Sequence, residues 1–246
     1  MNNPVLILSY NALPLLKRCV ESVRNQDAPT QIVVLDNGSS DGSREWIIAE
    51  DGLSGYSSVL EHNIGVSAGW NYGLKIIFGT WNAPCCLVLN QDTVLPTFFY
   101  RELAASGYLY DQATFVTGTE TKNMDDLAIP PEFKPPQPSP DFSAFLIGKT
   151  TWNRVGPFDE SLKNWCGDID YHVRAHRLGI NLWRANVLYF HDRSYTIRNA
   201  PPKQRKGFEM QGDVDRLTFA EKWNAVVGSP EHKALFSPEN FGIDAK

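Results

Sequence analysis

Long hydrophobic runs are absent from the sequence, since no apolar stretch approaches the roughly 18 residues that a membrane-spanning helix needs. The chain also does not open with a basic segment followed by a long apolar one, which is the pattern of a secretory signal. We therefore expect a cytoplasmic protein without a transmembrane segment. Cysteine is scarce as well and forms no CxxC pair, which predicts reduced, structural thiols at Cys19, Cys85, Cys86 and Cys166.

A strong excess of charge is also missing, because the formal net charge is -5 at pH 7. This value argues against a surface built mainly to bind nucleic acid or anionic lipid, although a local basic patch is compatible with it. Hydrophobic residues make up 42% and charged residues 21% of the chain, proportions that exclude a largely disordered protein. A length of 246 residues suits one main α/β domain with a C-terminal extension.

Short apolar runs alternate with segments of helical periodicity along the first 90 residues. We predict strands at 5–10, 31–35, 57–61 and 86–90, and helices at about 16–23, from Ser40 or Asp41 to Ile48, and at 67–78. Strands that alternate with helices predict a mostly parallel, Rossmann-like sheet with helices on both faces.

The second half of the chain is less regular. A strand is predicted at 115–119, and residues 122–142 hold six of the sixteen prolines, which indicates a long surface loop rather than a helix or a central strand. Further strands are expected at 144–148 and 181–189, and helices at 151–155, 168–178 and 214–226. Between the predicted strand at 181–189 and the predicted helix at 214–226 lies a basic segment that contains Arg193, Arg198, Lys203, Arg205 and Lys206.

Polar side chains follow each of the first four predicted strands, and in a parallel α/β sheet ligands bind at these carboxyl ends. The residues are Ser9, Tyr10 and Asn11, then Asp36 and Asn37, then Asn63 and Gly65, and finally Asn90, Gln91 and Asp92. This pattern predicts a ligand with several hydrogen-bonding groups, although residues 36–38 also suit a simple turn. Asp92 is well placed to hold a hard cation such as Mg²⁺ or Mn²⁺ beside a phosphate.

Taken together, five segments resemble the family 2 glycosyltransferases, which have the GT-A fold of nucleotide-diphospho-sugar transferases. They are residues 5–11 (VLILSYN), 34–43 (VLDNGSSDGS), 62–74 (HNIGVSAGWNYGL), 89–92 (LNQD), and 156–160 (GPFDE) with 167–170 (GDID). Segment 62–74 is similar to bacterial rhamnosyltransferase-like members, and segment 89–92 lies where the family has its DxD metal motif. Segments 156–160 and 167–170 together resemble the acceptor-side signature. The resemblance covers residues 4–195 and implies a donor half at about 1–120 and an acceptor half at about 140–195. Residues 196–246 then form a C-terminal extension with a basic loop and a helix.

The resemblance implies a role for each matching residue. Asp36 is expected to bind a pyrimidine base, which favours uridine or thymidine diphosphate donors, and Asp92 and His191 are expected to bind Mn²⁺ or Mg²⁺ at the donor phosphates. Asp168 is expected to be the general base of an inverting transfer to an acceptor hydroxyl. Further donor-binding candidates are Ser9, Asn11, Asn63, Gly65, Asn71, Asn90 and Gln91, and acceptor-side candidates are Trp165, Asp170 and Arg193.

Two departures from the family pattern leave alternatives open. Asn90 stands in place of the first aspartate of DxD, and Gly167 replaces the glutamate that usually precedes the base, so Asp170 competes with Asp168 for that role. Charges near a helix start and a histidine after a strand also have purely structural explanations. A non-catalytic nucleotide-sugar binding module therefore stays an alternative, whereas a dinucleotide oxidoreductase is disfavoured because no GxGxxG turn follows the first strand.

The acceptor is the least defined part of the prediction. A glycan or small molecule is the first expectation. Hydroxylated bases of DNA, as in bacteriophage-type transferases, are the alternative, with the basic segment at 193–206 on the phosphates. That segment is equally consistent with a solvated loop or a loop that covers the donor.

Overall fold

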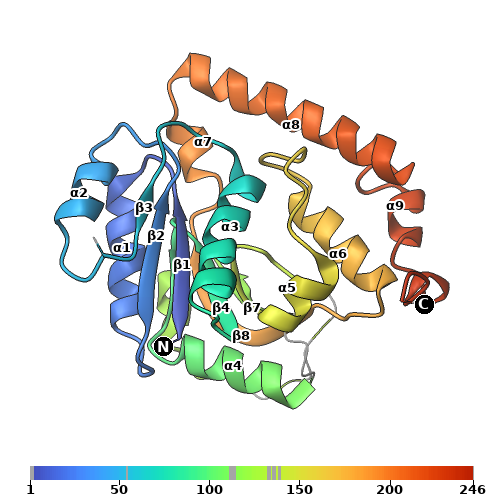
Figure 1. Cartoon of the computed structure of the whole chain (residues 1–246), viewed down its shortest axis with the longest axis horizontal. Coiled ribbons are helices and arrows are strands. Elements are labelled where there is room, and N and C mark those ends of the chain that lie inside the picture. The colour runs from blue at the N-terminus through green and yellow to red at the C-terminus, as the bar shows by residue number, and fades with distance from the viewer. Residues whose placement is uncertain are drawn as a thin grey trace.

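A mixed β-sheet of eight strands forms the centre of the molecule (Figure 1). The computed structural model describes residues 3–53, 55–110, 115–131, 134, 137 and 140–245. The strands lie in the order β3-β2-β1-β4-β7-β6-β8-β5. Their bounds are β1 Pro4–Ser9, β2 Gln31–Asp36, β3 Ser58–Val59, β4 Cys85–Asn90, β5 Thr93–Val94, β6 Phe115–Thr121, β7 Ala144–Gly148 and β8 Trp183–His191.

The first half of the sheet is parallel, as the alternation of strands and helices predicts. Strand β1 pairs with β2 and β4, and β2 pairs with β3, all in parallel. Beyond β4 the prediction of a mostly parallel sheet is only partly right, because β6 and β8 are parallel while β4–β7, β6–β7 and β5–β8 are antiparallel. Antiparallel neighbours need no helical crossover, and the described part of the proline-rich connection from β6 to β7 holds the short 3-10 helix η2 (Met124–Ala128) instead.

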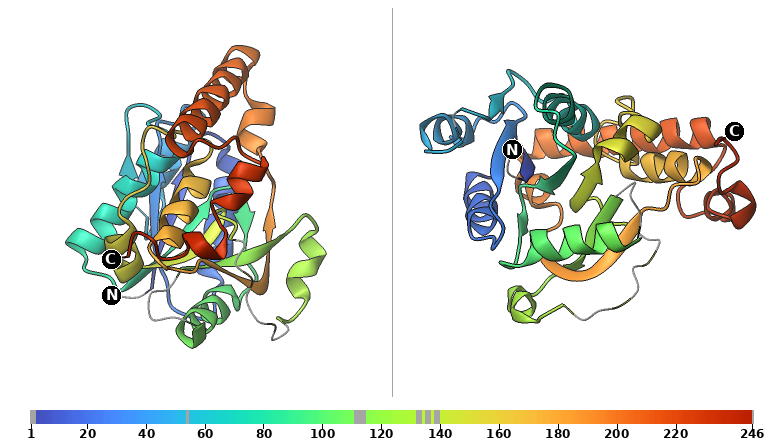
Figure 2. Two further views of the ribbon diagram at one scale, coloured as in Figure 1. Left: turned by 90° about the vertical axis from the view of Figure 1, so that its right-hand side faces the viewer. Right: turned by 60° about the horizontal axis from the view of Figure 1, so that its bottom comes forward.

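Helices cover both faces of the sheet (Figure 2). Their bounds are α1 Leu13–Arg24, α2 Ser43–Ala49, α3 Val66–Lys75 with the π-helical turn η1 Ile76–Thr80, α4 Phe99–Tyr110, α5 Lys149–Val155, α6 Gly167–Arg177, α7 Tyr195–Asn199, α8 Pro202–Trp223, α9 Pro230–Ala234 and η3 Pro238–Asn240.

Alternate residues of β1 supply the two hydrophobic cores, because successive side chains of a strand point to opposite faces. Val5 and Ile7 pack in one core with α1, α2 and α4, and Leu6 and Leu8 pack in the other with α3, α5 and α6. Helix α3 lies very close to the sheet: a Cβ atom on Gly73 would come within 2.5 Å of Leu6. The glycines in this segment therefore bring α3 against β1, next to the strand ends.

The C-terminal region differs most from its prediction. The basic segment predicted as a loop is largely helical, since it forms α7 and the first turns of α8, and α8 begins twelve residues before the predicted Val214. Helix α4 was not predicted, and the predicted cap of α2 is displaced, because Gly42 occupies the N-cap position. Helix α8 runs across the top of the molecule beside α6 (Figure 1). No helix among the described residues is long and apolar enough to cross a membrane.

The four cysteines are free thiols, as predicted, and three of them are buried. Burial raises the pKa of Cys19 to about 12, although a hydrogen bond to Thr93 opposes this shift. A thiol whose pKa lies so far above neutrality stays protonated and is a poor nucleophile. Cys19 of α1 therefore acts as a small apolar residue in the hydrophobic core between this helix and the sheet.

Candidate active site

A cleft of about 550 Å³ opens where the carboxyl ends of β1, β2 and β4 meet the acceptor-side block. Its walls come from three parts of the chain. The strand ends supply Tyr10, Asn37, Asn63, Asn90, Gln91 and Asp92; the middle block supplies Asp141, Phe142, Ser143, Asn164, Trp165 and Asp168; and the C-terminal part supplies His191, Arg193, Ser194, Thr196, Ile197 and Phe208. An adjoining hollow of about 350 Å³ shares Asp168 and Trp165 with the cleft.

Gln91 organises the turn that follows β1. Its Oε1 accepts hydrogen bonds from Ser9 Oγ at 2.8 Å and from the Tyr10 backbone N–H at 3.1 Å. Its Nε2 donates to the carbonyls of Tyr10 and Asn11 at 2.8 and 2.7 Å. Ser9 is fully buried and does not line the cleft, whereas Gln91 does. Ser9 and Gln91 therefore shape this wall together, and Asn11 turns away to accept from the Ser40 backbone N–H.

Asp36, the last residue of β2, is fully buried and does not line the cleft. Its carboxylate accepts hydrogen bonds from the backbone N–H and the hydroxyl of Ser39. Burial raises the pKa of Asp36 above its usual value, and the hydrogen bonds from Ser39 only partly offset this rise. The next residue, Asn37, lines the cleft instead.

Asn37, Asn63 and Gly65 lock β2 to the segment before α3. Asn37 Nδ2 donates to the Gly65 carbonyl at 3.1 Å, and Asn63 Oδ1 accepts from the Gly65 N–H at 2.8 Å. Gly65 has φ +94, and a Cβ atom there would lie 3.0 Å from the carbonyl oxygen of Lys163. Asn37 and Asn63 thus line the cleft, and Gly65 allows the close approach of the acceptor-side chain.

Asn71 lies outside the cleft although the resemblance implied a donor contact. Its side chain is buried and bonds both ways with the Phe158 backbone, at 2.8 Å in each direction, and its Nδ2 also donates to Glu160. These bonds tie α3 to the turn at 156–160. Asn71 therefore uses both of its amide donors and one acceptor position of Oδ1 to join two parts of the fold.

Asp92 and His191 meet at the edge of the cleft because β5 and β8 pair in antiparallel register, with Thr93 opposite His191. His191 Nε2 lies 3.3 Å from Asp92 Oδ1, and Nδ1 lies 3.2 Å from Glu120 Oε2. Burial lowers the pKa of His191, but the hydrogen bonds and charges of Asp92 and Glu120 outweigh it, so the pKa is raised overall. The imidazole is thus held between two carboxylates.

This geometry fits two ligands of a divalent cation. Two ligand atoms at right angles, each about 2.1 Å from Mg²⁺, stand about 3 Å apart, close to the separation of His191 Nε2 and Asp92 Oδ1. Glu120 occupies the position of the carboxylate that orients a metal-binding histidine through its other nitrogen. Among the described residues no group of three or more His, Cys, Asp or Glu side chains is arranged so that it could hold a metal ion. Other ligands have to come from water or from a substrate phosphate.

Glu120 and Asp141 are site residues that the sequence analysis missed. Arg193 Nε donates to Glu120 Oε2 at 2.6 Å, and an Arg193 Nη atom lies 3.4 Å from Asp141 Oδ2. Burial raises the pKa of Asp141, but hydrogen bonds from Ser143 outweigh it and lower the pKa overall. Glu120 lies in β6, one residue beyond the predicted strand end, so the rule that polar residues at strand ends form sites could have found it.

Asp168, in the first turn of α6, is the carboxylate of that helix that faces the cleft. Burial raises its pKa, the N–H groups of the first turn lower it, and the charge of Asp141 raises it further, so the net shift is upward. The preceding Gly167 leaves no room for the usual glutamate, because a Cβ atom there would lie 2.4 Å from Ser67 Oγ. Helix α3 thus packs closely against the position at which the motif departs from the family pattern.

Asp170 has a different environment, although it is only two residues away. It is fully buried and bonds to Arg174 Nε at 2.8 Å, Trp223 Nε1 at 2.9 Å and Lys222 Nζ at 2.7 Å. It lines neither the cleft nor the adjoining hollow. Asp170 therefore joins α6 to α8, and of the acceptor-side candidates only Trp165 and Arg193 line the cleft.

Comparisons with known proteins identify the family and the fold of the chain. The model of glycosyl transferase family 2 matches residues 5–153. Hexosyltransferase Agl10 of low-salt glycan biosynthesis in Haloferax volcanii is 23% identical over 208 residues, which cover 75% of this chain and 64% of that protein. The chain thus spans less than two thirds of that relative.

Two solved structures share the fold at low identity. The 1–349 fragment of S. aureus TarS in complex with UDP-GlcNAc has a TM-score of 0.61 and 16% identity, over 96% of this chain and 70% of that one. The mannosyltransferase PcManGT from Pyrobaculum calidifontis, in complex with GDP-Man and Mn²⁺, has a TM-score of 0.56 and 17% identity, over 97% of this chain and 69% of that one. Since the family match covers more than half of the sequence, the chain belongs to glycosyl transferase family 2, and its α/β architecture is the GT-A fold.

Proposed function

We propose that this protein transfers a sugar from a nucleotide-diphosphate sugar to an acceptor hydroxyl, with inversion at the anomeric carbon. The observation that carries the proposal is that one cleft is lined both by the Asp92–His191 pair and by the carboxylate of Asp168. The Asp92–His191 pair suits a cation at the donor diphosphate, and the Asp168 carboxylate suits an acceptor hydroxyl that has to lose a proton. Family membership supports the same reaction class.

On the donor side, Asp92 and His191 would hold Mn²⁺ or Mg²⁺, and Glu120 would orient the imidazole. A bound cation supplies positive charge where the nucleoside diphosphate departs. The Mn²⁺ in the PcManGT complex supports this assignment. The Asp36 carboxylate accepts both hydrogen bonds from Ser39, and we propose that Asp36 favours a pyrimidine base by fixing the shape of the turn at 36–39.

On the acceptor side, Asp168 would accept the hydroxyl proton as the acceptor oxygen attacks the anomeric carbon. The bond from that carbon to the diphosphate oxygen breaks in the same step, and the diphosphate leaves with its electron pair. The raised pKa of Asp168 makes it a stronger base than an ordinary aspartate, which suits this task. Trp165 beside it offers an aromatic face to an acceptor.

A glycan or small-molecule acceptor is favoured over DNA by the charges around the cleft. Arg193 is bonded to Glu120, Arg198 to Asp192, and Arg205 to the Arg198 carbonyl. Arginines already paired within the protein have less to offer to phosphates. Of the five basic residues of this segment only Arg193 lines the cleft.

The test is to measure release of free nucleoside diphosphate from UDP-, dTDP- and GDP-sugars, with Mn²⁺ and with excess chelator, and to identify products by mass spectrometry. Acceptors would be methyl glycosides, short oligosaccharides and hydroxymethylated DNA. We expect metal-dependent transfer to a carbohydrate that Asp92→Asn largely abolishes, while Asp213→Asn on the exposed face of α8 is unaffected. Nucleotide binding without turnover of any donor would support a binding module instead, and a glycosylated DNA base would overturn the acceptor proposal.

A further inference from the structure

Helix α8 contacts the segment that carries Trp165 through a buried carboxylate. The segment, residues 162–166, is called the acceptor loop below; it leads directly into α6 and Asp168. Asp215 of α8 is fully buried. Its Oδ2 accepts hydrogen bonds from the backbone N–H groups of Asn164 at 2.8 Å and Trp165 at 2.9 Å, and its Oδ1 accepts from Lys163 N–H at 3.2 Å and from Gln211 Nε2 at 2.7 Å. One carboxylate thus satisfies three successive loop N–H groups, which would otherwise be costly to bury.

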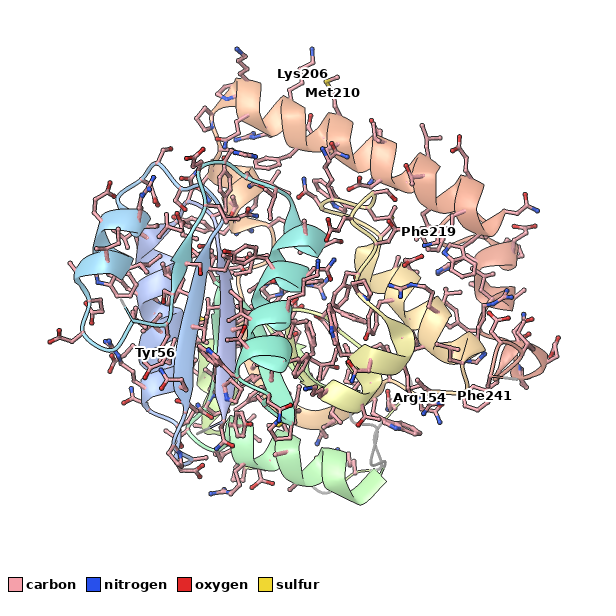
Figure 3. All side chains as sticks on the ribbon, in the orientation of Figure 1. Tyr56, Arg154, Lys206, Met210, Phe219 and Phe241 are labelled. Atoms are coloured by element: carbon pink, nitrogen blue, oxygen red, sulfur yellow. The ribbon has the colours of Figure 1, made fainter. Side chains whose placement is uncertain are left out.

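A second contact is made by the backbone of α8 itself. A Cβ atom on Gly212 would lie 3.3 Å from Cε3 of the Trp165 ring, closer than an ordinary van der Waals contact. The absence of a side chain at this position lets the indole lie directly against the helix. Phe219, one turn beyond Asp215, packs with Leu162 and Cys166 of the same loop and lies between α8 and α6 (Figure 3).

The other side of the acceptor loop is held by α3. The Lys163 carbonyl accepts from the Val66 and Ser67 N–H groups at 2.6 and 3.2 Å, and Ser67 Oγ donates to the Leu162 carbonyl at 2.6 Å. The loop therefore lies between α3, which belongs to the donor half, and α8, which is far away in the sequence. Of these two supports, α8 is the one that touches Trp165 and the N–H groups at the cleft.

We propose that α8 sets the position of the acceptor loop, with Asp215 and Gly212 as positioning residues for acceptor binding. This inference rests on the proposed function, because it takes the Trp165 wall as the place where the acceptor lies. Asp215 and Gly212 touch the loop and not the cleft, so they act through Trp165 and Asn164. Their replacement should weaken acceptor binding while the strand-end residues that face the donor stay in place.

Two matched pairs of variants on the same helix test this. Asp215→Asn places an NH₂ donor opposite N–H groups whichever way the amide turns, whereas Asp213→Asn changes an exposed carboxylate whose partner is Arg216. Gly212→Ala and Gly207→Ala gain similar helix propensity, but only the first meets Trp165, because nothing lies within 4 Å of a Cβ atom on Gly207. Each pair therefore separates the loop contact from a general effect on α8.

The first measurement needs no acceptor. In protein labelled with 5-fluorotryptophan, the ¹⁹F signal of Trp165, assigned with Trp165→Phe, should shift in Asp215→Asn and Gly212→Ala and stay in place in both controls. In the transfer assay, Asp215→Asn should raise the acceptor KM about tenfold, the effect of losing a hydrogen bond to a charged group. The donor KM and the affinity for UDP should stay within about twofold.

An unchanged Trp165 signal in Asp215→Asn and Gly212→Ala would overturn the proposal, and so would an equal rise of donor and acceptor KM, which indicates general loss of structure. These outcomes differ from failure of the proposed function. If the wild-type protein transfers no sugar to any acceptor, the enzymatic assignment fails, while the fluorine signals still decide whether α8 positions the loop.

Discussion

Replacement of Asp168 and of Asp170 by asparagine should have opposite effects on activity and stability. Asp168 faces the cleft, and its pKa is raised in the folded state. A carboxyl group with a raised folded pKa lowers stability once the pH exceeds its unfolded pKa, because folding then opposes ionisation. Asp168→Asn should therefore keep or slightly raise the melting temperature at neutral pH. Loss of a general base should lower transfer per folded molecule by about 10² to 10⁴.

Asp170→Asn should instead cost stability. The carboxylate is fully buried and bonded to Arg174, Lys222 and Trp223. Removal of one partner of a buried ion pair costs about 3–5 kcal/mol. Asparagine keeps a hydrogen bond to Trp223, so we take about 3 kcal/mol, which at about 2–4 °C per kcal/mol lowers the melting temperature by roughly 6–12 °C. Transfer per folded molecule should change little.

The assay combines calorimetric melting with donor turnover, measured well below the melting temperature and corrected for the folded fraction. Asp213→Asn serves as the control, because this carboxylate is exposed on α8. The reasoning is wrong if folded Asp170→Asn is inactive while Asp168→Asn transfers normally. It is also wrong if Asp168→Asn melts several degrees lower, because the carboxylate would then stabilise the fold.

Three further perturbations follow from other parts of the structure. Ala12 has φ 95 and ψ 49, a left-handed conformation that glycine adopts more readily than alanine. Ala12→Gly should therefore raise the free energy of unfolding by up to about 1 kcal/mol, seen as a higher urea midpoint at unchanged slope. A lower midpoint would show that the backbone at Ala12 is not strained. Burial raises the pKa of Asp159, but hydrogen bonds from Lys222 and Ser161 outweigh burial and lower the pKa from 3.8 to about 2. The ionised carboxylate therefore stabilises the folded state above pH 3.8, and this stabilisation is lost as the pH falls toward about 2. Asp159→Asn should flatten acid unfolding in that window, and an unchanged acid limb would show that Asp159 does not carry this stabilisation. Glu120→Gln should raise the Mn²⁺ concentration for half-maximal turnover about tenfold or more, and full activity in chelator would exclude the metal role.

Local patterns in the sequence were sufficient to predict the strands and helices of the parallel half of the fold. Residues 5–9 and 31–36 are apolar runs that end in polar side chains, and the intervening helix has apolar residues at helical spacing. Because parallel strands end at the same edge, Gln91 and Asp92 could be placed beside Tyr10 without a structure. Packing then divided such residues, since all four of Ser9, Asp36, Asn37 and Gln91 are buried but only Asn37 and Gln91 line the cleft.

Tertiary packing decided which carboxylates serve the site. Asp168 and Asp170 share the first turn of one helix and cannot be told apart by spacing, but Lys222 and Trp223 of α8 bury Asp170 and leave Asp168 at the cleft. Glu120 became part of the site through its contact with His191, 71 residues away. Periodicity depends on neighbours within a few residues and is therefore readable from the sequence, whereas burial and ion pairing depend on contacts between distant segments, which form only when the helices and strands pack together.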